Sequence, residues 1–201
     1  MTTRTTLLVS HKGVDLHAAT AVRVMQRRLE DGDALHRLAR CELHTFTDDG
    51  ERCRVTDLLE IGRYFNPNKH HYGHFEWTTA ETDAFDDPAP GGATLAAAWP
   101  GEAVASDTDA PGAGLYERLL GGPVPEGCVA VDLAAMPLGD HEVVRSGVLW
   151  RLVLADDGRA PERLAERLAI ARSGVQGLLV NPHLDRWLIR VQRAQDEGGP
   201  A

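Results

Sequence analysis

The chain has 201 residues, with 30 acidic and 21 basic side chains and a formal net charge of −9. The imbalance comes from one stretch, because nine acids and no Lys or Arg lie between His70 and Glu117. Phosphate binding needs a basic face, so this charge disfavours nucleic acid as the main partner. It also disfavours binding to an anionic membrane surface.

Composition predicts a globular protein of the cytoplasm. A hydrophobic content of 43% and a charged content of 25% are typical of soluble domains. No apolar run approaches the roughly 18 residues that span a bilayer, so no membrane segment is expected. Residues 1–9 lack the features of a signal peptide. Cys41, Cys53 and Cys128 have no metal-like spacing, which favours reduced thiols.

The first half of the chain predicts three strands, at residues 5–10, 41–47 and 70–77. Between the second and third, residues 57–65 form a short helical or mixed piece. It ends at Asn66-Pro67, because a proline disfavours the α conformation at the residue before it.

A helix of about four turns is expected between the first two strands. Asp15 offers an N-cap, and Gly32 lies in the Asp-Gly-Asp turn that ends the helix. One apolar stripe marks its buried face: Ala18, Val22, Met25 and Leu29.

Residues 78–114 break this pattern, since they are rich in Ala, Gly, Pro, Asp and Thr with little periodicity. They predict a long flexible linker. Phe85, Leu95 and Trp99 are apolar enough for part of it to pack on the body.

The second half predicts strands at 129–133, 148–154 and 185–191. Pro161 suits the first position of a helix that ends before Asn181-Pro182. Five apolar residues mark the expected face of this helix: Leu164, Leu168, Ala171, Val175 and Leu178.

Two internal matches indicate a duplication. LHTFTDDG at 43–50 aligns with RLVLADDG at 151–158 with an offset of 108, and FNPNKHHY at 65–72 aligns with VNPHLDRW at 180–187 with an offset of 115. The difference of seven residues, about two helical turns, predicts a longer second helix in the second copy. The first helix has only a poor counterpart there, at 138–145.

These observations predict an α/β (α+β) protein with two repeats and antiparallel sheets. The expected organisation is repeat 1 at 1–77, an acidic linker at 78–127, repeat 2 at 128–195 and a tail at 196–201.

The start of the first repeat and the end of the second resemble the PurS family, the small subunit of bacterial formylglycinamidine ribonucleotide synthase. GLLVNPHLDRWLIRV at 177–191 is similar to its closing segment, in which Leu-Leu-Ala-Asn-Pro ends a helix and an aromatic follows six residues after the Asn. LLVSHKGVDLHAATAVRVMQRRL at 7–29 is similar to its opening strand, Lys-x-Gly-Val turn and helix. The similarity covers about 130 residues and excludes the middle segment.

The resemblance implies two ferredoxin-like PurS-type units that form a pseudo-dimer within one chain. It also implies a bridging role in purine or purine-like nucleoside biosynthesis, with a synthetase and a glutaminase as partners. PurS subunits perform no chemistry themselves. In agreement, the sequence has no G-x-x-x-x-G-K-[ST] phosphate loop and no recognisable nucleophile signature, and no cofactor is expected.

One strand departs from the family, which has acidic and apolar residues here. Three histidines fall within five residues in the segment KHHYGHFEW at 69–77. Because side chains alternate along a strand, one face is expected to carry four candidate catalytic residues: His70, Tyr72, His74 and Glu76. The other face would carry His71, Phe75 and Trp77.

Three uses of this strand remain open. Such a face has groups that exchange protons near neutral pH, with candidate substrate-binding residues beside it: Asn66, Asn68, Lys69 and His71. A metal is the weaker alternative, because His70 and His74 would lie about 13 Å apart. It would need His74 and Glu76, with His44 from a neighbouring strand. A solvated polar face or a subunit interface is the third.

Two functions therefore compete. The first is the bridging subunit of an ATP- and glutamine-dependent amidotransferase. The second is a stand-alone enzyme that has recruited the same fold for acid–base chemistry, as a lyase, isomerase or hydrolase, with a small-molecule ligand on the histidine strand.

Overall fold

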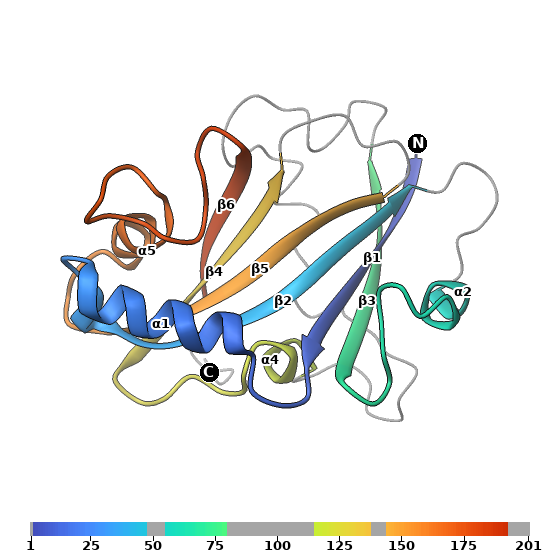
Figure 1. The fold of residues 1–201 in the computed structure, drawn as a ribbon, viewed down its shortest axis with the longest axis horizontal. Coiled ribbons are helices and arrows are strands. Elements are labelled where there is room, and N and C mark those ends of the chain that lie inside the picture. The colour runs from blue at the N-terminus through green and yellow to red at the C-terminus, as the bar shows by residue number, and fades with distance from the viewer. Residues whose placement is uncertain (1, 48–54, 80–114, 138–143, 193–201) are drawn as a thin grey trace, which may run out of the picture.

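The computed structural model describes residues 2–47, 55–79, 115–137 and 144–192, without the side chains of 2–4, 47, 57, 76–79, 115–116 and 144–145. These residues form an α+β fold around one six-stranded sheet (Figure 1). The strands are β1 (Thr2–His11), β2 (Leu35–Thr47), β3 (His70–Thr79), β4 (Cys128–Pro137), β5 (Val144–Ala155) and β6 (Asp185–Gln192). The helices are α1 (Leu16–Arg28), α2 (Val55–Glu60), α4 (Leu115–Leu119) and α5 (Pro161–Ala169), with a 3₁₀ turn η1 (Gly32–Ala34).

The strand order is β3-β1-β2-β5-β4-β6, and each neighbouring pair is antiparallel. The first three strands therefore form one half of the sheet and the last three form the other. From the centre outward, the order is second, first and third strand on both sides. The predicted α+β class with antiparallel pairing is confirmed, but the strands form one sheet and not separate sheets.

The register at the centre of the sheet follows the internal sequence match. Cys41 pairs with Leu149, which lies 108 residues further along the chain. On either side, Arg40 pairs with Trp150 and Glu42 pairs with Val148. With an offset of 108, Arg40 corresponds to Val148 and Glu42 corresponds to Trp150, so each flanking pair is the counterpart of the other. Residues aligned by the Asp-Asp-Gly match therefore occupy corresponding places on β2 and β5.

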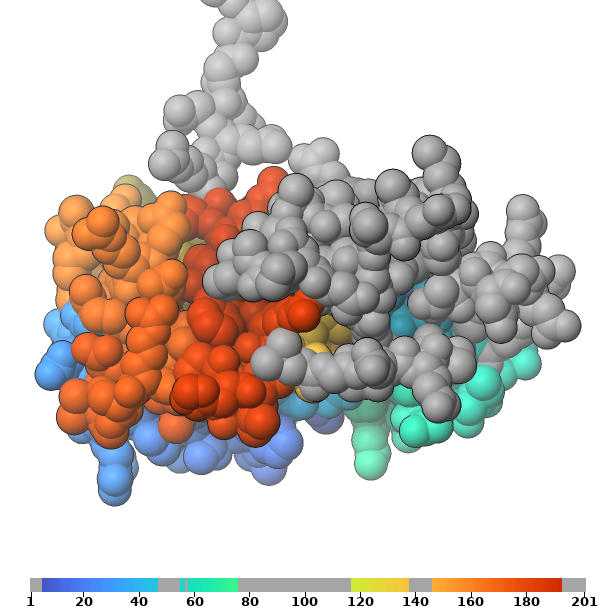
Figure 2. Space-filling model, turned by 90° about the horizontal axis from the view of Figure 1, so that it is seen from above, coloured from blue at the N-terminus to red at the C-terminus, as the bar shows by residue number. Residues whose placement is uncertain are grey.

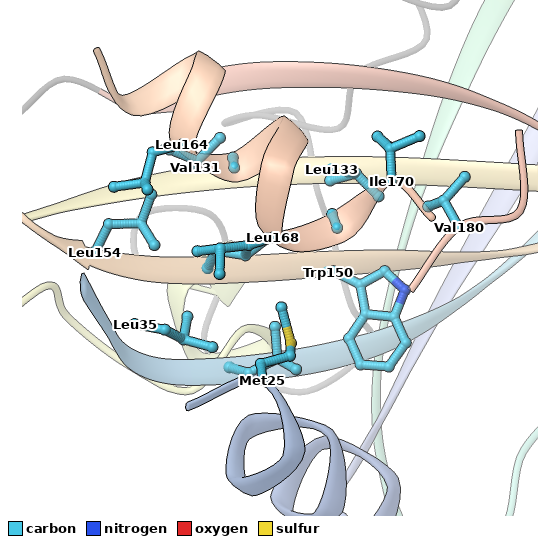
Figure 3. Packing of buried hydrophobic residues seen from close by; sticks show 14 of the residues in the cluster. Met25, Leu35, Val131, Leu133, Trp150, Leu154, Leu164, Leu168, Ile170 and Val180 are labelled. Carbon is cyan, nitrogen blue, oxygen red and sulfur yellow. The ribbon is translucent and has the colours of Figure 1, made fainter. Parts of the chain in front are cut away.

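Helices α1 and α5 lie over the same end of one sheet face (Figure 1). Met25 of α1 and Leu168 of α5 are fully buried and point into one shared interior with Leu154 of β5 (Figure 3). The same cluster contains Leu133 and Trp150. It forms the main core, because these elements bury their apolar sides against one another.

Helix α2 covers the other end of the same face. Leu58 packs there with Leu7, Val9 and Phe46. Seen from above, the orange residues of the second half and the green residues of α2 and β3 mark opposite ends of the molecule (Figure 2). The middle of this sheet face lies between them.

The local signals for α1 are confirmed. Asp15 caps the helix, since its Oδ1 accepts hydrogen bonds from the backbone N–H groups of His17 at 2.8 Å and Ala18 at 3.2 Å. Gly32 follows the end of the helix because a Cβ there would lie 2.2 Å from the carbonyl oxygen of Met25.

The predicted helix in the second half is wrong beyond Ala169. Pro161 is in its first turn as expected, but the chain leaves the helix at Ile170 and returns beside it, with a parallel bridge between Ile170 and Val180. Gly177 has a φ of +76°, and a Cβ there would lie 1.8 Å from the carbonyl oxygen of Ile170. A left-handed glycine and a tight backbone return replace the expected turns. Helix α5 is thus only three residues longer than α2.

Several segments differ in extent from the prediction. Strand β2 begins at Leu35, six residues earlier than expected. The end of the predicted linker contains α4, whose last residue Leu119 and the following Leu120 are buried against the opposite sheet face. The candidate helix at 138–145 fails at Val144, where β5 begins; 138–143 lie outside the described residues. Phe85, Leu95 and Trp99 also lie outside them.

The opposite sheet face carries a buried ion pair. Arg151 donates to both carboxylate oxygens of Asp132, at 2.7 and 2.8 Å, and Gln192 donates to the same carboxylate at 3.0 Å. Within the described ranges, none of the helices has the length and apolar character to span a bilayer.

Candidate functional site

The histidine strand has the predicted alternation of faces. Tyr72 packs with Leu7 and Val9 on the face covered by α2, whereas Phe75 packs with Leu8 on the opposite face. His71 is exposed.

His70 lies in an aromatic cluster and not in an open pocket. Its ring contacts His11 edge-on at a centroid distance of 4.9 Å and lies 6.3 Å from Phe65. Phe65 also packs on Tyr72 at 4.9 Å. Burial, and then the neighbouring His11, lower the pKa of His70 below its usual value. The adjoining cavity has about 10 Å³, which is the size of one water.

The Asn-Pro motif forms the same hydrogen-bonded turn in both halves. Asn66 Oδ1 accepts from the backbone N–H of Asn68 at 3.0 Å, and its carbonyl accepts from His70 N–H at 2.8 Å. Asn181 Oδ1 accepts from His183 N–H at 3.0 Å, and its carbonyl accepts from Asp185 N–H at 2.8 Å.

Even the side chain four residues after each Asn has a matching role. His70 Nδ1 accepts from Asn66 N–H at 3.2 Å, and Asp185 Oδ2 accepts from Asn181 N–H at 2.9 Å. This turn starts the last strand of each half, so Asn66 has a structural use that accounts for the motif.

The remaining predicted binding residues lie on the outside of this turn. Asn68 and Lys69 are exposed. The carbonyl of Lys69 accepts from Lys12 N–H at 2.8 Å, and Lys12 Nζ donates to the carbonyl of Pro67 at 2.6 Å. These contacts join the turn to the loop after β1.

The residues of the metal alternative are not brought together by the described structure. His74 and His44 both face Leu7 on β1, from opposite sides. Two strand spacings put their backbones about 10 Å apart with Leu7 between them. Glu76 pairs with Thr5, but its side chain lies outside the described part. Among the side chains that the structure describes, no group of three His, Cys, Asp or Glu could hold a metal ion.

A larger site lies in the middle of the helix-covered face. It is a groove of about 310 Å³ that contains His44 and Ser146 near its polar side. Its remaining lining comes from both halves: Arg40, Glu42, Ala135, Pro137, Gly147, Val148, Trp150, Leu179 and Asp185. We call this site the central groove.

Polar side chains that line the central groove contact one another, and one of them also contacts Asp15 outside the groove. Arg40 donates to Glu42 Oε1 at 2.9 Å and lies 3.6 Å from Asp15 Oδ2. His44 Nε2 lies 3.7 Å from Glu42 Oε2, and His44 Nδ1 shares a hydrogen bond of 2.8 Å with Ser146 Oγ. His44 is only 8% exposed, so its surroundings differ from those of a solvated surface residue.

Glu42 stays ionised in this setting. The His44 imidazole and the Arg40 guanidinium lower the pKa of Glu42 to about 2, against the opposing effect of partial burial. At 3.7 Å the His44 contact is longer than a hydrogen bond, so we regard Arg40 at 2.9 Å as the stronger direct partner. Glu42 therefore carries a negative charge in the central groove at neutral pH.

One polar atom of the groove lining has unused hydrogen-bonding capacity. His44 Nε2 is buried and makes no hydrogen bond within the described part of the chain. Buried polar atoms normally have partners, so unused capacity beside a groove is a feature of binding and catalytic sites.

Sequence reasoning found only one member of the central groove, His44, as a helper for a metal. Arg40 lies just before the strand predicted at 41–47, and Glu42 lies within that strand but in no chemical motif. Ser146 is 102 residues from His44 and meets it only through the β2–β5 pairing. The one available signal was the alternation of Arg40, Glu42 and His44 at every second position.

Comparisons with family models, with curated proteins and with solved structures find no match to this chain.

Proposed function

We propose that the protein is a PurS-like bridging subunit, built as a fused pair of ferredoxin-like units. In this role it would join an ATP-using synthetase to a glutaminase in purine or purine-like nucleoside biosynthesis. The catalytic residues for both half-reactions would lie on those partner chains.

The observation that carries the proposal is the symmetric register at the centre of the sheet. Two copies that associate through the same strand pair a residue with its own counterpart on the symmetry axis. Cys41 and Leu149 are such counterparts, and they are paired. This supports a pseudo-dimer in which each half supplies three strands, as the resemblance to PurS implies.

The Asn-Pro turns give independent support. Asn66 and Asn181 make the same set of turn contacts at the start of the last strand of their halves. The motif on which the resemblance rests thus has one structural role at both of its positions.

Reconstitution of glutamine-dependent activity tests the bridging role. A synthetase and a glutaminase from the same organism would be assayed with this chain for amide transfer from glutamine, with free ammonia as the control nitrogen source. We expect the chain to be required with glutamine and dispensable with ammonia. Equal glutamine-dependent activity without the chain would reject the role.

A second candidate function is acid–base catalysis in the central groove, favoured by the position of His44 between Glu42 and Ser146. A carboxylate on one side and a hydroxyl on the other orient an imidazole and provide a proton path. This geometry favours His44 as the base, whereas the sequence alone points to His74.

Two histidine variants distinguish these candidates for any turnover that the isolated chain shows. His44→Ala should abolish it if the central groove is the site, while His74→Ala should do so if the histidine strand is the site. If both variants retain full turnover, the enzyme hypothesis fails in both forms. Circular dichroism and thermal unfolding verify that each variant folds.

A further inference from the structure

The central groove lies where one half of the protein lacks a helix that the other half has. Helix α1, with 13 residues, connects β1 to β2, whereas only residues 138–143 separate β4 from β5. Six residues are too few to match α1. Under the exchange of halves that aligns Cys41 with Leu149, a counterpart of α1 would lie over the start of β5, beside Ser146 and Val148.

Two polar residues of the groove, Glu42 and His44, have apolar counterparts in the other half. With the offset of 108, Glu42 corresponds to Trp150 and His44 corresponds to Leu152. Trp150 and Leu152 belong to the main core under α1 and α5. The central groove therefore has charged and hydrogen-bonding groups at positions where the other half has apolar core residues.

Simple exposure to water does not account for these groups. His44 is 8% exposed, and its Nε2 is buried without a hydrogen bond within the described residues. A ligand in the groove would satisfy this nitrogen, because an imidazole can donate or accept a hydrogen bond.

The charge of the central groove indicates whether its ligand would be a cation or an anion. Among the described residues that line the groove, Glu42 and Asp185 are carboxylates, and Arg40, which pairs with Glu42, is the one guanidinium. An anionic ligand would meet repulsion from the carboxylates, whereas a cation would be attracted.

The volume and the lining of the groove indicate the size and the apolar part of the ligand. The volume of about 310 Å³ is at the lower end for small-molecule sites. Ala135, Val148 and Leu179 give the groove apolar walls next to its charged floor.

We propose that the central groove binds a small organic cation, an amine, amidine or guanidine with an apolar or aromatic body. The charged group lies against Glu42, and the body packs on Val148 and Leu179. This inference rests on the groove alone, and it holds for a bridging subunit and for an enzyme.

Titration of the full chain with matched probes tests the proposal. Benzamidine, phenylguanidine and benzylamine supply the cation, benzamide is the neutral control and benzoate is the anionic control. Amide chemical shifts of Glu42, His44, Ser146 and Val148 in NMR spectra report binding in the groove. We expect saturable shifts with at least one cation, weaker shifts with benzamide and none with benzoate.

Variants locate the site. Glu42→Gln should weaken cation binding about tenfold through loss of a charged hydrogen bond, whereas Glu126→Gln, at an exposed residue, should not change it. Val148→Phe fills the groove without changing its charge and should also prevent binding. This second variant tests the proposal even if Glu42→Gln disturbs the fold. Absence of saturable groove shifts with all three cations, or equal binding of benzoate, would overturn the proposal.

Discussion

Cys41 and Leu149 face each other at the centre of the sheet, and both are fully buried. They are separated by the same 108 residues that separate the two Asp-Asp-Gly motifs. Because this pair lies where the two halves meet, its surroundings report on the integrity of the whole sheet.

Cys41 should be protected from thiol reagents until the sheet opens. Burial raises the pKa of its thiol far above the usual value, and only the thiolate reacts. In a Cys53→Ser/Cys128→Ser background, Cys41 should react with a disulfide reagent at a rate that follows global unfolding with denaturant. Native-state labelling as fast as labelling in denaturant would contradict the central burial.

The two Asn-Pro turns should contribute equally to stability. Asn66→Ala and Asn181→Ala each remove a side-chain acceptor for a backbone N–H, and each should lower the free energy of unfolding by about 1 kcal/mol. Asn68→Ala, at an exposed neighbour, should have little effect. Denaturant unfolding measures all three. An Asn66→Ala variant of normal stability that loses ligand binding would instead support a binding role for Asn66.

Gly177 should be irreplaceable in the segment after α5. An alanine there would need a left-handed φ and would clash with the backbone of Ile170, so Gly177→Ala should cost more than about 2 kcal/mol of stability. Gly174→Ala is the matched control, because a Cβ at Gly174 would have no atom within 4 Å and the φ there is not left-handed. Similar unfolding midpoints for the two variants would contradict the close approach of Gly177 to the backbone of Ile170.

Most strands were predictable because their local signals agree with their surroundings. Trp187, Ile189 and Val191 alternate along β6 and pack on the main core, as their spacing predicts. The N-cap at Asp15 is equally local.

The second helix shows where local spacing misleads. Ala171, Val175 and Leu178 continue the helical spacing of Leu164 and Leu168, but the chain has left the helix by Ile170. Close packing at Gly177 determines this path, and periodicity carries no information about it.

The central groove could not be predicted because its members meet only through long-range pairing. Arg40 and His44 come from the first half, and Ser146 and Asp185 come from the second. The sequence predicts a site on the histidine strand because its residues are adjacent in sequence. In the fold, His70 and Tyr72 pack against Phe65, while His74 is separated from His44 by Leu7.

Acid should remove the contribution of Glu42 to stability. Its pKa is about 2 in the folded protein, below its ordinary value of 4.5, so its contribution is present above pH 4.5 and is lost as the pH falls towards 2. The advantage of the wild type over Glu42→Gln should therefore shrink across that window. Since Glu42 is 39% exposed, the effect should be small. Denaturant midpoints at several pH values measure it; a difference that stays constant from pH 4.5 to 2 would contradict the ion pair with Arg40.

The bridging role is tested most directly by assembly. The chain would be mixed with a synthetase and a glutaminase from the same organism, with ATP and glutamine present, and the masses of the complexes measured by light scattering after size-exclusion chromatography. A bridging subunit should give a single species that contains all three proteins, and no synthetase–glutaminase complex should form when the chain is omitted. Elution of the chain alone, with neither partner bound, would contradict it.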